Sequence, residues 1–252
     1  MTRTAQVSTH SLFLSDREIR YELTRKKVKN INIRVHADGT VHVSANAAVP
    51  MREIEAVLLK KATFLLRALD RFAERKAPAP LSFTDGERIP LLGEEKILRV
   101  VLSTKNSVTE EDDALILAVR EPDNIEFKRR VLMRYTDRLC KKVVTAVCHH
   151  IYPLFLSDMA STDHPPADFP FPTIRFRVMR SRWGSCRPKT GVLTFNTRLV
   201  FHPIPCIEYV VMHEFTHFLH PDHSARFYQA LTMRMPDFKE RKALLDSTPV
   251  FI

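Results

Sequence analysis

Residues 207–219 read IEYVVMHEFTHFL, and this segment decides what kind of protein we expect. It is apolar up to its HEFTH pattern and lies between Pro205 and Pro221, which predicts a buried helix with defined ends. His213 and His217 are four residues apart. Side chains at that spacing project from one helix face, so both imidazoles can bind a single metal ion.

Glu214 follows the first histidine, which lets its carboxylate reach a metal-bound water as a general base. A catalytic zinc has three protein ligands and one open position. His223 completes this set with His213 and His217, provided that the chain reverses after the helix. His220 competes for the third position, but it lies three residues past His217 on the same helix, which would have to unwind. It also occupies the glycine position of the similarly spaced pattern HExxHxxGxxH. We therefore expect one Zn²⁺ per chain on His213, His217 and His223.

The segment RSRWGSCRPKT (residues 180–190) precedes this helix and is expected to join two short strands. Hydrolysis at a carbonyl requires donors that stabilise the developing oxyanion. Arg182, Ser185 and the backbone N–H groups around Gly184 are the nearest candidates. The alternative is a purely structural hairpin, in which Gly184 supplies the turn and Trp183 packs over the histidine helix.

The rest of the chain alternates between strand and helix patterns. Period-two alternation predicts strands, and apolar residues three and four apart predict helices. The expected strands are residues 18–25, 29–36, 40–46, 174–179 and 191–196, with further strands in 81–120; the expected helices are 51–75, 123–154 and 224–233. Turns or loops are expected at 37–39, 85–86, 92–93, 110–113 and 157–172, and a proline linker at 76–80.

These elements predict an α+β protein in three segments. Residues 1–80 should form an N-terminal antiparallel β-subdomain with an amphipathic helix. Residues 81–122 should form a β-rich middle segment. Residues 123–252 should form a metallohydrolase domain around the HExxH active-site helix.

Composition narrows the class of protein further. The 252 residues carry a net charge of +10, concentrated in residues 1–80 (+7) and 123–200 (+8). Such a basic surface predicts weak association with nucleic acid, or only a solvated face. No apolar run approaches bilayer length and no leader pattern opens the sequence, so we expect a cytoplasmic protein without a membrane partner. The four cysteines form no CxxC pair, which is typical of free thiols.

Several motifs together resemble the YgjP-like metallopeptidase domain, which is related to the SprT-type minimal zincins. They are SRWGSC at residues 181–186, GVL with Asn196 at 191–196, YVVMHEFTH at 209–217 and HSARFY at 223–228. Tyr228 stands where the family usually has tryptophan. The resemblance covers most of the chain and implies a zincin-like fold. It also implies a zinc-dependent hydrolase with His213, His217 and His223 as ligands and Glu214 as catalytic base.

Three functions remain open on this basis. The first is hydrolysis of a peptide or protein by a zinc-bound water that Glu214 activates. The second keeps the metal but cleaves a nucleoside triphosphate such as UTP at a phosphoanhydride bond; arginines in residues 175–187 could bind phosphate oxygens. The third is a DNA-associated module with non-catalytic zinc, which would leave Glu214 without a role.

Overall fold

The computed structural model describes residues 7–36, 39–74, 81–160, 169–179 and 181–248. The chain divides into two compact units, Met1–Pro78 and Ala79–Ile252. The expected linker at 76–80 and residues 37 and 38 of the expected turn lie outside the described residues. No helix among the described residues combines the length and the apolarity needed to cross a bilayer.

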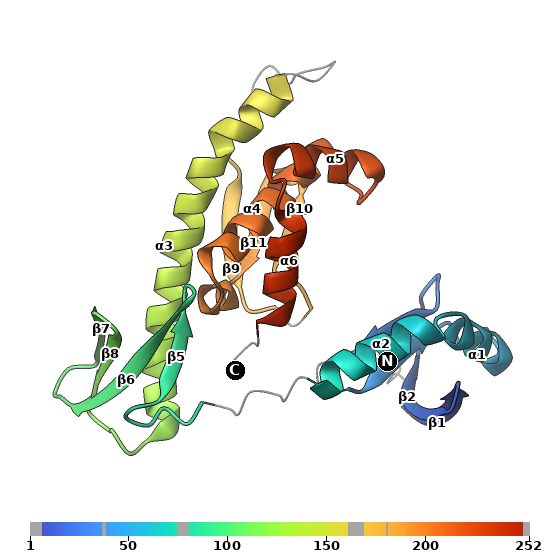
Figure 1. Cartoon of the computed structure of the whole chain (residues 1–252), viewed down its shortest axis with the longest axis horizontal. Coiled ribbons are helices and arrows are strands. Elements are labelled where there is room, and N and C mark those ends of the chain that lie inside the picture. The colour runs from blue at the N-terminus through green and yellow to red at the C-terminus, as the bar shows by residue number, and fades with distance from the viewer. Residues whose placement is uncertain (1–6, 37–38, 75–80, 161–168, 180, 249–252) are drawn as a thin grey trace, which may run out of the picture. The chain divides into compact units, whose positions relative to one another are not determined.

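The first unit is a mixed sheet covered by two helices (Figure 1). Its elements are β1 (Val7–Leu14), β2 (Arg17–Arg25), β3 (Asn32–Val35), β4 (Val41–Ala45), α1 (Met51–Lys60) and α2 (Ala62–Glu74). The strand order is β1-β2-β4-β3, and β2 pairs with β4 in parallel while the other pairs are antiparallel. The expectation of a fully antiparallel sheet was therefore wrong for one pair, because the β3–β4 hairpin joins β2 through its second strand. Strand β1 was not predicted, since half of its residues are exposed and only Leu14 is buried.

The helix expected over residues 51–75 is divided at Lys61, whose backbone (φ −102°, ψ 13°) leaves the helical region. The division lets both helices face the same core: Ile54 of α1 and Leu65 of α2 are fully buried in one cluster with Leu23 and Val43 of the sheet. The first unit thus has a core of its own.

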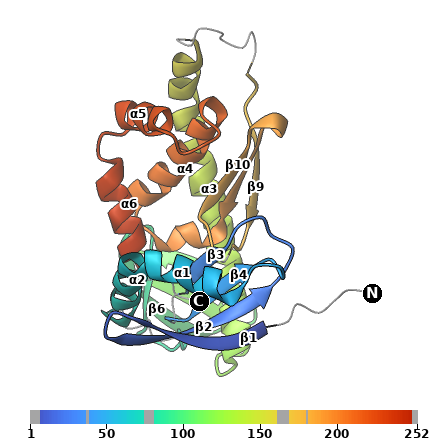
Figure 2. The same cartoon turned by 90° about the vertical axis from the view of Figure 1, so that its right-hand side faces the viewer.

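The second unit contains two sheets arranged along one long helix. Its first elements are β5 (Arg88–Leu91), β6 (Glu94–Leu102), β7 (Ser107–Glu111), β8 (Ala114–Val119) and α3 (Ile125–Ala160). They are followed by β9 (Thr173–Arg177), β10 (Gly184–Arg187), η1 (Pro188–Thr190), β11 (Val192–Asn196), η2 (Thr197–Phe201), α4 (Ile204–Leu219), α5 (Ala225–Arg234) and α6 (Phe238–Ser247). Figure 1 shows β5–β8 at the N-terminal part of α3 and α4–α6 beside its later turns. In the rotated view of Figure 2, β9 and β10 lie on one side of α4 and α5 and α6 on the other.

One continuous core runs through this unit. It includes Leu98 and Leu117 from the four-stranded sheet, Val144 of α3 and Phe215 of α4. Residues 81–122 therefore share their core with the segment that carries the HExxH helix. The turns expected at 85–86 and 92–93 are present, with positive φ at Gly86 and Gly93.

Two sequence expectations in this unit were wrong, and one helix was not predicted. Helix α3 runs to Ala160 through Pro153, so residues 157–160 are helical rather than part of a loop. The apolar contacts of Phe155 with Phe215 and Phe218 stabilise the helix beyond Pro153. Residues 184–187 form strand β10 where only a connection was expected, and α6 was not predicted.

Candidate metal centre

The histidine helix α4 forms where the prolines and the apolar run predict it. Pro203 is its N-cap residue, and His220 after its last turn adopts an extended backbone (φ −131°, ψ 97°). Most of the helix is buried on all sides, including Val211 and Phe215, which are fully enclosed. This packing gives the motif a rigid support within the core.

The three predicted histidines converge at the end of this helix. One ligand atom from each of His213, His217 and His223 lies within 4.8 Å of the other two. The Nε2 atoms of His213 and His223 are 3.0 Å apart. Tetrahedral zinc with Zn–N distances near 2.05 Å would place such nitrogens roughly 3.3 Å apart, so the geometry fits a zinc ion.

His220 contributes its backbone rather than its ring to this centre. The Nδ1 atom of His217 lies 3.2 Å from the carbonyl oxygen of His220. A carbonyl oxygen only accepts, so Nδ1 must carry the proton, which leaves the Nε2 lone pair of His217 free for a metal. His220 itself is not part of the convergent group among the described residues.

The electrostatics keep two of these imidazoles neutral. Burial, followed by the charges of His217 and His223, lowers the pKa of His213 to about 3. Burial also lowers the pKa of His217, although the hydrogen bond to His220 opposes the shift. Metal binding requires unprotonated imidazole, so the centre is prepared for a cation at neutral pH.

Phe227 of α5 supports all three rings and was not singled out from the sequence. Its ring centroid lies 4.9 Å from His213, 4.7 Å from His217 and 4.9 Å from His223. The residue is completely buried. The position of Phe227 four residues after His223 was the available signal, but its contact with all three histidines depends on how α5 folds back onto α4.

Glu214 lies beside the histidines in a nearly closed environment, with 5% of its surface exposed. Burial raises the pKa of its carboxyl group to about 8; the positive charge of Arg182 and a hydrogen bond from the backbone N–H of Cys186 act in the opposite direction. A cation on the histidines would also act against this rise in the pKa of Glu214, because a nearby positive charge favours the carboxylate.

The segment before the helix supplies a wall of this site. Gly184 is the first residue of strand β10, and its Cα lies directly against the Glu214 side chain. It does not supply a turn, as the structural alternative assumed, and its φ is not positive. Trp183 packs edge-on against the buried ring of His202, with centroids 4.4 Å apart.

The two candidate oxyanion donors differ in position. Arg182 is exposed, but its charge acts on Glu214. Side chains alternate along a strand, so Ser185 projects to the face of β10 opposite Gly184 and Cys186. Its partner Thr194 is half-buried there, whereas Leu193 and Phe195 face the core. The structure thus brings Arg182 to the site and directs Ser185 away from it.

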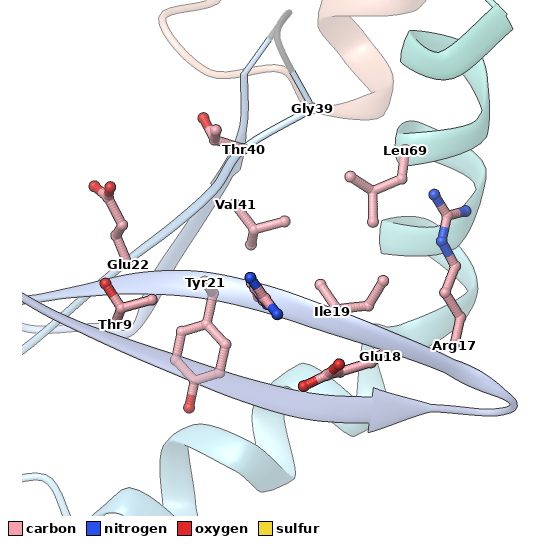
Figure 3. A pocket seen from close by; sticks show the side chains of 11 residues that line it. Thr9, Arg17, Glu18, Ile19, Tyr21, Glu22, Gly39, Thr40, Val41 and Leu69 are labelled. Carbon is pink, nitrogen blue, oxygen red and sulfur yellow. The ribbon is translucent and has the colours of Figure 1, made fainter.

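A separate pocket of about 380 Å³ lies in the first unit (Figure 3). Figure 3 shows Ile19, Val41 and Leu69 around it, with Arg17 at its margin. Arg17 pairs with Asp70 at 2.6 Å. No cysteine or histidine lines this pocket, so it offers no soft metal ligand.

The helix and the three converging histidines place this centre in the class of HExxH metal sites. The chain belongs to the YgjP-like metallopeptidase family, since the family model "YgjP-like, metallopeptidase domain" matches residues 29–248. This confirms the resemblance inferred from the sequence motifs. Among solved structures, the crystal structure of the metallopeptidase zymogen of Pyrococcus abyssi abylysin is similar to this chain. The two are 16% identical with a TM-score of 0.32, over 43% of this chain and 99% of that chain. No curated protein matches the chain.

Proposed function

We propose that this protein is a zinc-dependent metallopeptidase in which His213, His217 and His223 hold the metal and Glu214 is the general base. The observation that carries the proposal is the convergence of three imidazoles beside a buried glutamate. A structural zinc site usually has four protein ligands and needs no adjacent base. Three ligands beside a carboxylate therefore favour a catalytic role over a non-catalytic one.

The chemistry divides between the metal and the chain. Zinc bound to the three histidines would supply Lewis acidity, which polarises a substrate carbonyl and makes a coordinated water more acidic. Glu214 then accepts the proton of the attacking water on its carboxylate and passes it to the nitrogen of the leaving amine. Arg182, whose positive charge acts on Glu214, helps to keep this carboxyl group ionised.

The position of β10 favours a peptide as the substrate. The order of its sheet is β10-β11-β9, so β10 is an edge strand among the described residues. An extended peptide can add to such an edge through main-chain hydrogen bonds. Because Gly184 of β10 lies against Glu214, a peptide paired there would pass close to the base.

The arginines that suggested a nucleotide substrate lie mostly elsewhere. Arg175 and Arg177 are exposed on β9, and Arg187 is exposed on β10. By strand alternation all three project to the face opposite Gly184, away from Glu214. Arg180 lies outside the described residues. This placement gives the phosphoanhydride reaction less support than peptide hydrolysis.

The test combines metal analysis with turnover. Zinc content should be measured by mass spectrometry, and hydrolysis of casein and of UTP followed in the wild type and in Glu214→Gln. The proposal predicts one zinc per chain in both proteins, with casein cleavage lower by about 10²–10⁴-fold in the variant. Pyrophosphate release from UTP that depends on Glu214 would move the function to nucleotide hydrolysis. Absence of zinc from the purified wild type would contradict the proposed centre.

A further inference from the structure

The side chain of Asn196, the last residue of β11, forms an unusually complete set of hydrogen bonds. It is 3% exposed. Its Nδ2 donates to the carbonyl oxygens of Met179 at 2.8 Å and Arg182 at 3.2 Å, and its Oδ1 accepts from the backbone N–H of Arg198 at 3.2 Å. Since carbonyls only accept and N–H groups only donate, these partners fix the orientation of the amide.

These bonds hold the segment that leads from β9 into β10. The backbone N–H of Asn196 also donates to the carbonyl oxygen of Trp183, at 2.8 Å. One residue therefore binds the carbonyls of Met179, Arg182 and Trp183. β9 and β10 lie on opposite edges of the sheet, so this connection must cross the end of β11, where Asn196 is located.

The crossing ends at the wall of the candidate active site. Trp183 is followed directly by Gly184, which lies against the carboxyl group of Glu214, and Arg182 supplies the positive charge that acts on the same carboxyl group. We propose that Asn196 is a positioning residue: by binding the three carbonyls it holds Gly184 and Arg182 in place beside Glu214. Its effect on hydrolysis rests on the proposed function, whereas its hold on the crossing segment can be measured independently.

A space-filling role does not account for an amide at this position. The neighbouring core residues of β11, Leu193 and Phe195, are fully buried and apolar. An apolar side chain at 196 could fill the same volume, but it would leave the backbone groups of the crossing segment without partners. Buried polar groups without partners are costly, so the two donors of Asn196 explain the residue.

The cysteines provide a local probe of this arrangement. Cys186 of β10 is half-buried, and its backbone N–H binds Glu214; Cys148 and Cys206 are buried in α3 and α4. Loosening of the crossing segment should expose the thiol of Cys186 and leave Cys148 and Cys206 buried. General loosening of the domain should expose all three.

The experiment compares Asn196→Ala and Asn196→Asp with Thr194→Ala, a control on the same strand. Each protein is alkylated with iodoacetamide and the modified cysteines are quantified by mass spectrometry, in parallel with zinc content, kcat and KM on casein. Aspartate has the size and the acceptor oxygen of asparagine but lacks its donors. Asn196→Asp should therefore behave like the wild type if residue 196 only fills space, and like Asn196→Ala if its donors position the segment. We expect both Asn196 variants to label Cys186 about tenfold faster or more, because both lose the two hydrogen bonds donated by Nδ2 and the alanine variant also loses the bond accepted by Oδ1. Cys148, Cys206, the zinc content and KM should change little, and kcat should fall about tenfold.

Several results would overturn the proposal. They are unchanged labelling of Cys186 in folded variants, equal acceleration at all three cysteines, full rescue by aspartate, and faster labelling with unchanged kcat. Should Asn196→Ala fail to fold, Asn196→Ser takes its place under the same criteria. If the wild type cleaves neither casein nor UTP, the proposed function fails, while the labelling ratio still decides whether Asn196 holds the strand.

Discussion

The Cα atom of Gly184 lies directly against the carboxyl group of Glu214. A Cβ atom at residue 184 would be 2.5 Å from Oε1, 2.6 Å from Cγ and 2.8 Å from Cδ of the glutamate. These distances are far below a normal carbon contact, so the carboxyl group occupies the space where a side chain would be. The glycine of the SRWGSC segment is thus required by the position of Glu214, and not by a turn.

Gly184→Ala should accordingly move Glu214 and abolish most hydrolysis. The three atoms nearest to this methyl position all belong to Glu214 and none to a histidine, so zinc content should remain near the wild-type level. Metal analysis and casein cleavage test this expectation. Gly191→Ala is a suitable control: its φ is +61°, which strains alanine by roughly 1–2 kcal/mol, but nothing lies within 4 Å of the added carbon. The control should lose stability and keep its activity. Full activity in Gly184→Ala would contradict the described position of Glu214.

Zinc binding should distinguish His223 from His220. His223→Ala removes one of the three converging nitrogens and should lose most of the bound zinc. His220→Ala should retain it, because His220 contributes its backbone carbonyl to His217 and alanine keeps that group. Competition with a chromogenic chelator gives both affinities. Zinc loss in His220→Ala alone would reassign the third ligand.

The stability of the zinc-stripped protein should depend on pH through Glu214. Burial raises the pKa of this carboxyl group from 4.5 to about 8, so the folded state keeps a proton that the unfolded chain releases above pH 4.5. Stability should therefore fall as pH rises from about 4.5 to 8. The upper limit of the effect on the free energy of unfolding is on the order of 5 kcal/mol.

Thermal unfolding of the zinc-stripped wild type and Glu214→Gln at pH 5 and pH 9 measures this contribution. The variant lacks the titrating group, so its Tm should fall less between the two pH values. Other groups contribute equally to both proteins. An identical change in Tm for the two would show that Glu214 is not buried as described.

Arg182 and Ser185 should differ in their effect on catalysis. Removing the charge in Arg182→Ala should raise the pKa of Glu214 and move the acidic limb of the kcat/KM profile to higher pH, with about three- to tenfold less activity at pH 7. Ser185→Ala should change activity less than about twofold, because alternation along β10 directs this hydroxyl to the opposite face. A pH profile that moves in Ser185→Ala and stays constant in Arg182→Ala would reverse the assignment.

Local patterns predicted the elements that depend on near neighbours in the chain. The helix that carries His213 and His217, the turns at Gly86 and Gly93 and the short strand that ends at Asn196 all follow from spacing, proline and glycine. Elements decided by distant contacts were missed. The parallel pairing of β2 with β4 depends on which strand a hairpin joins, and the continuation of α3 through Pro153 depends on Phe155 packing against α4.

The same division applies to the site. The sequence by itself indicated Glu214 and a set of three histidines, because HExxH places His213 and His217 on one helix face and His223 follows the turn at Pro221. Only the tertiary structure decided that Gly184 forms the wall behind Glu214, that Phe227 supports three imidazoles and that Asn196 holds the crossing segment. The physical reason is that helical spacing sets the direction of a side chain within a few residues. The burial and the partners of that side chain are set by segments that arrive from elsewhere in the chain.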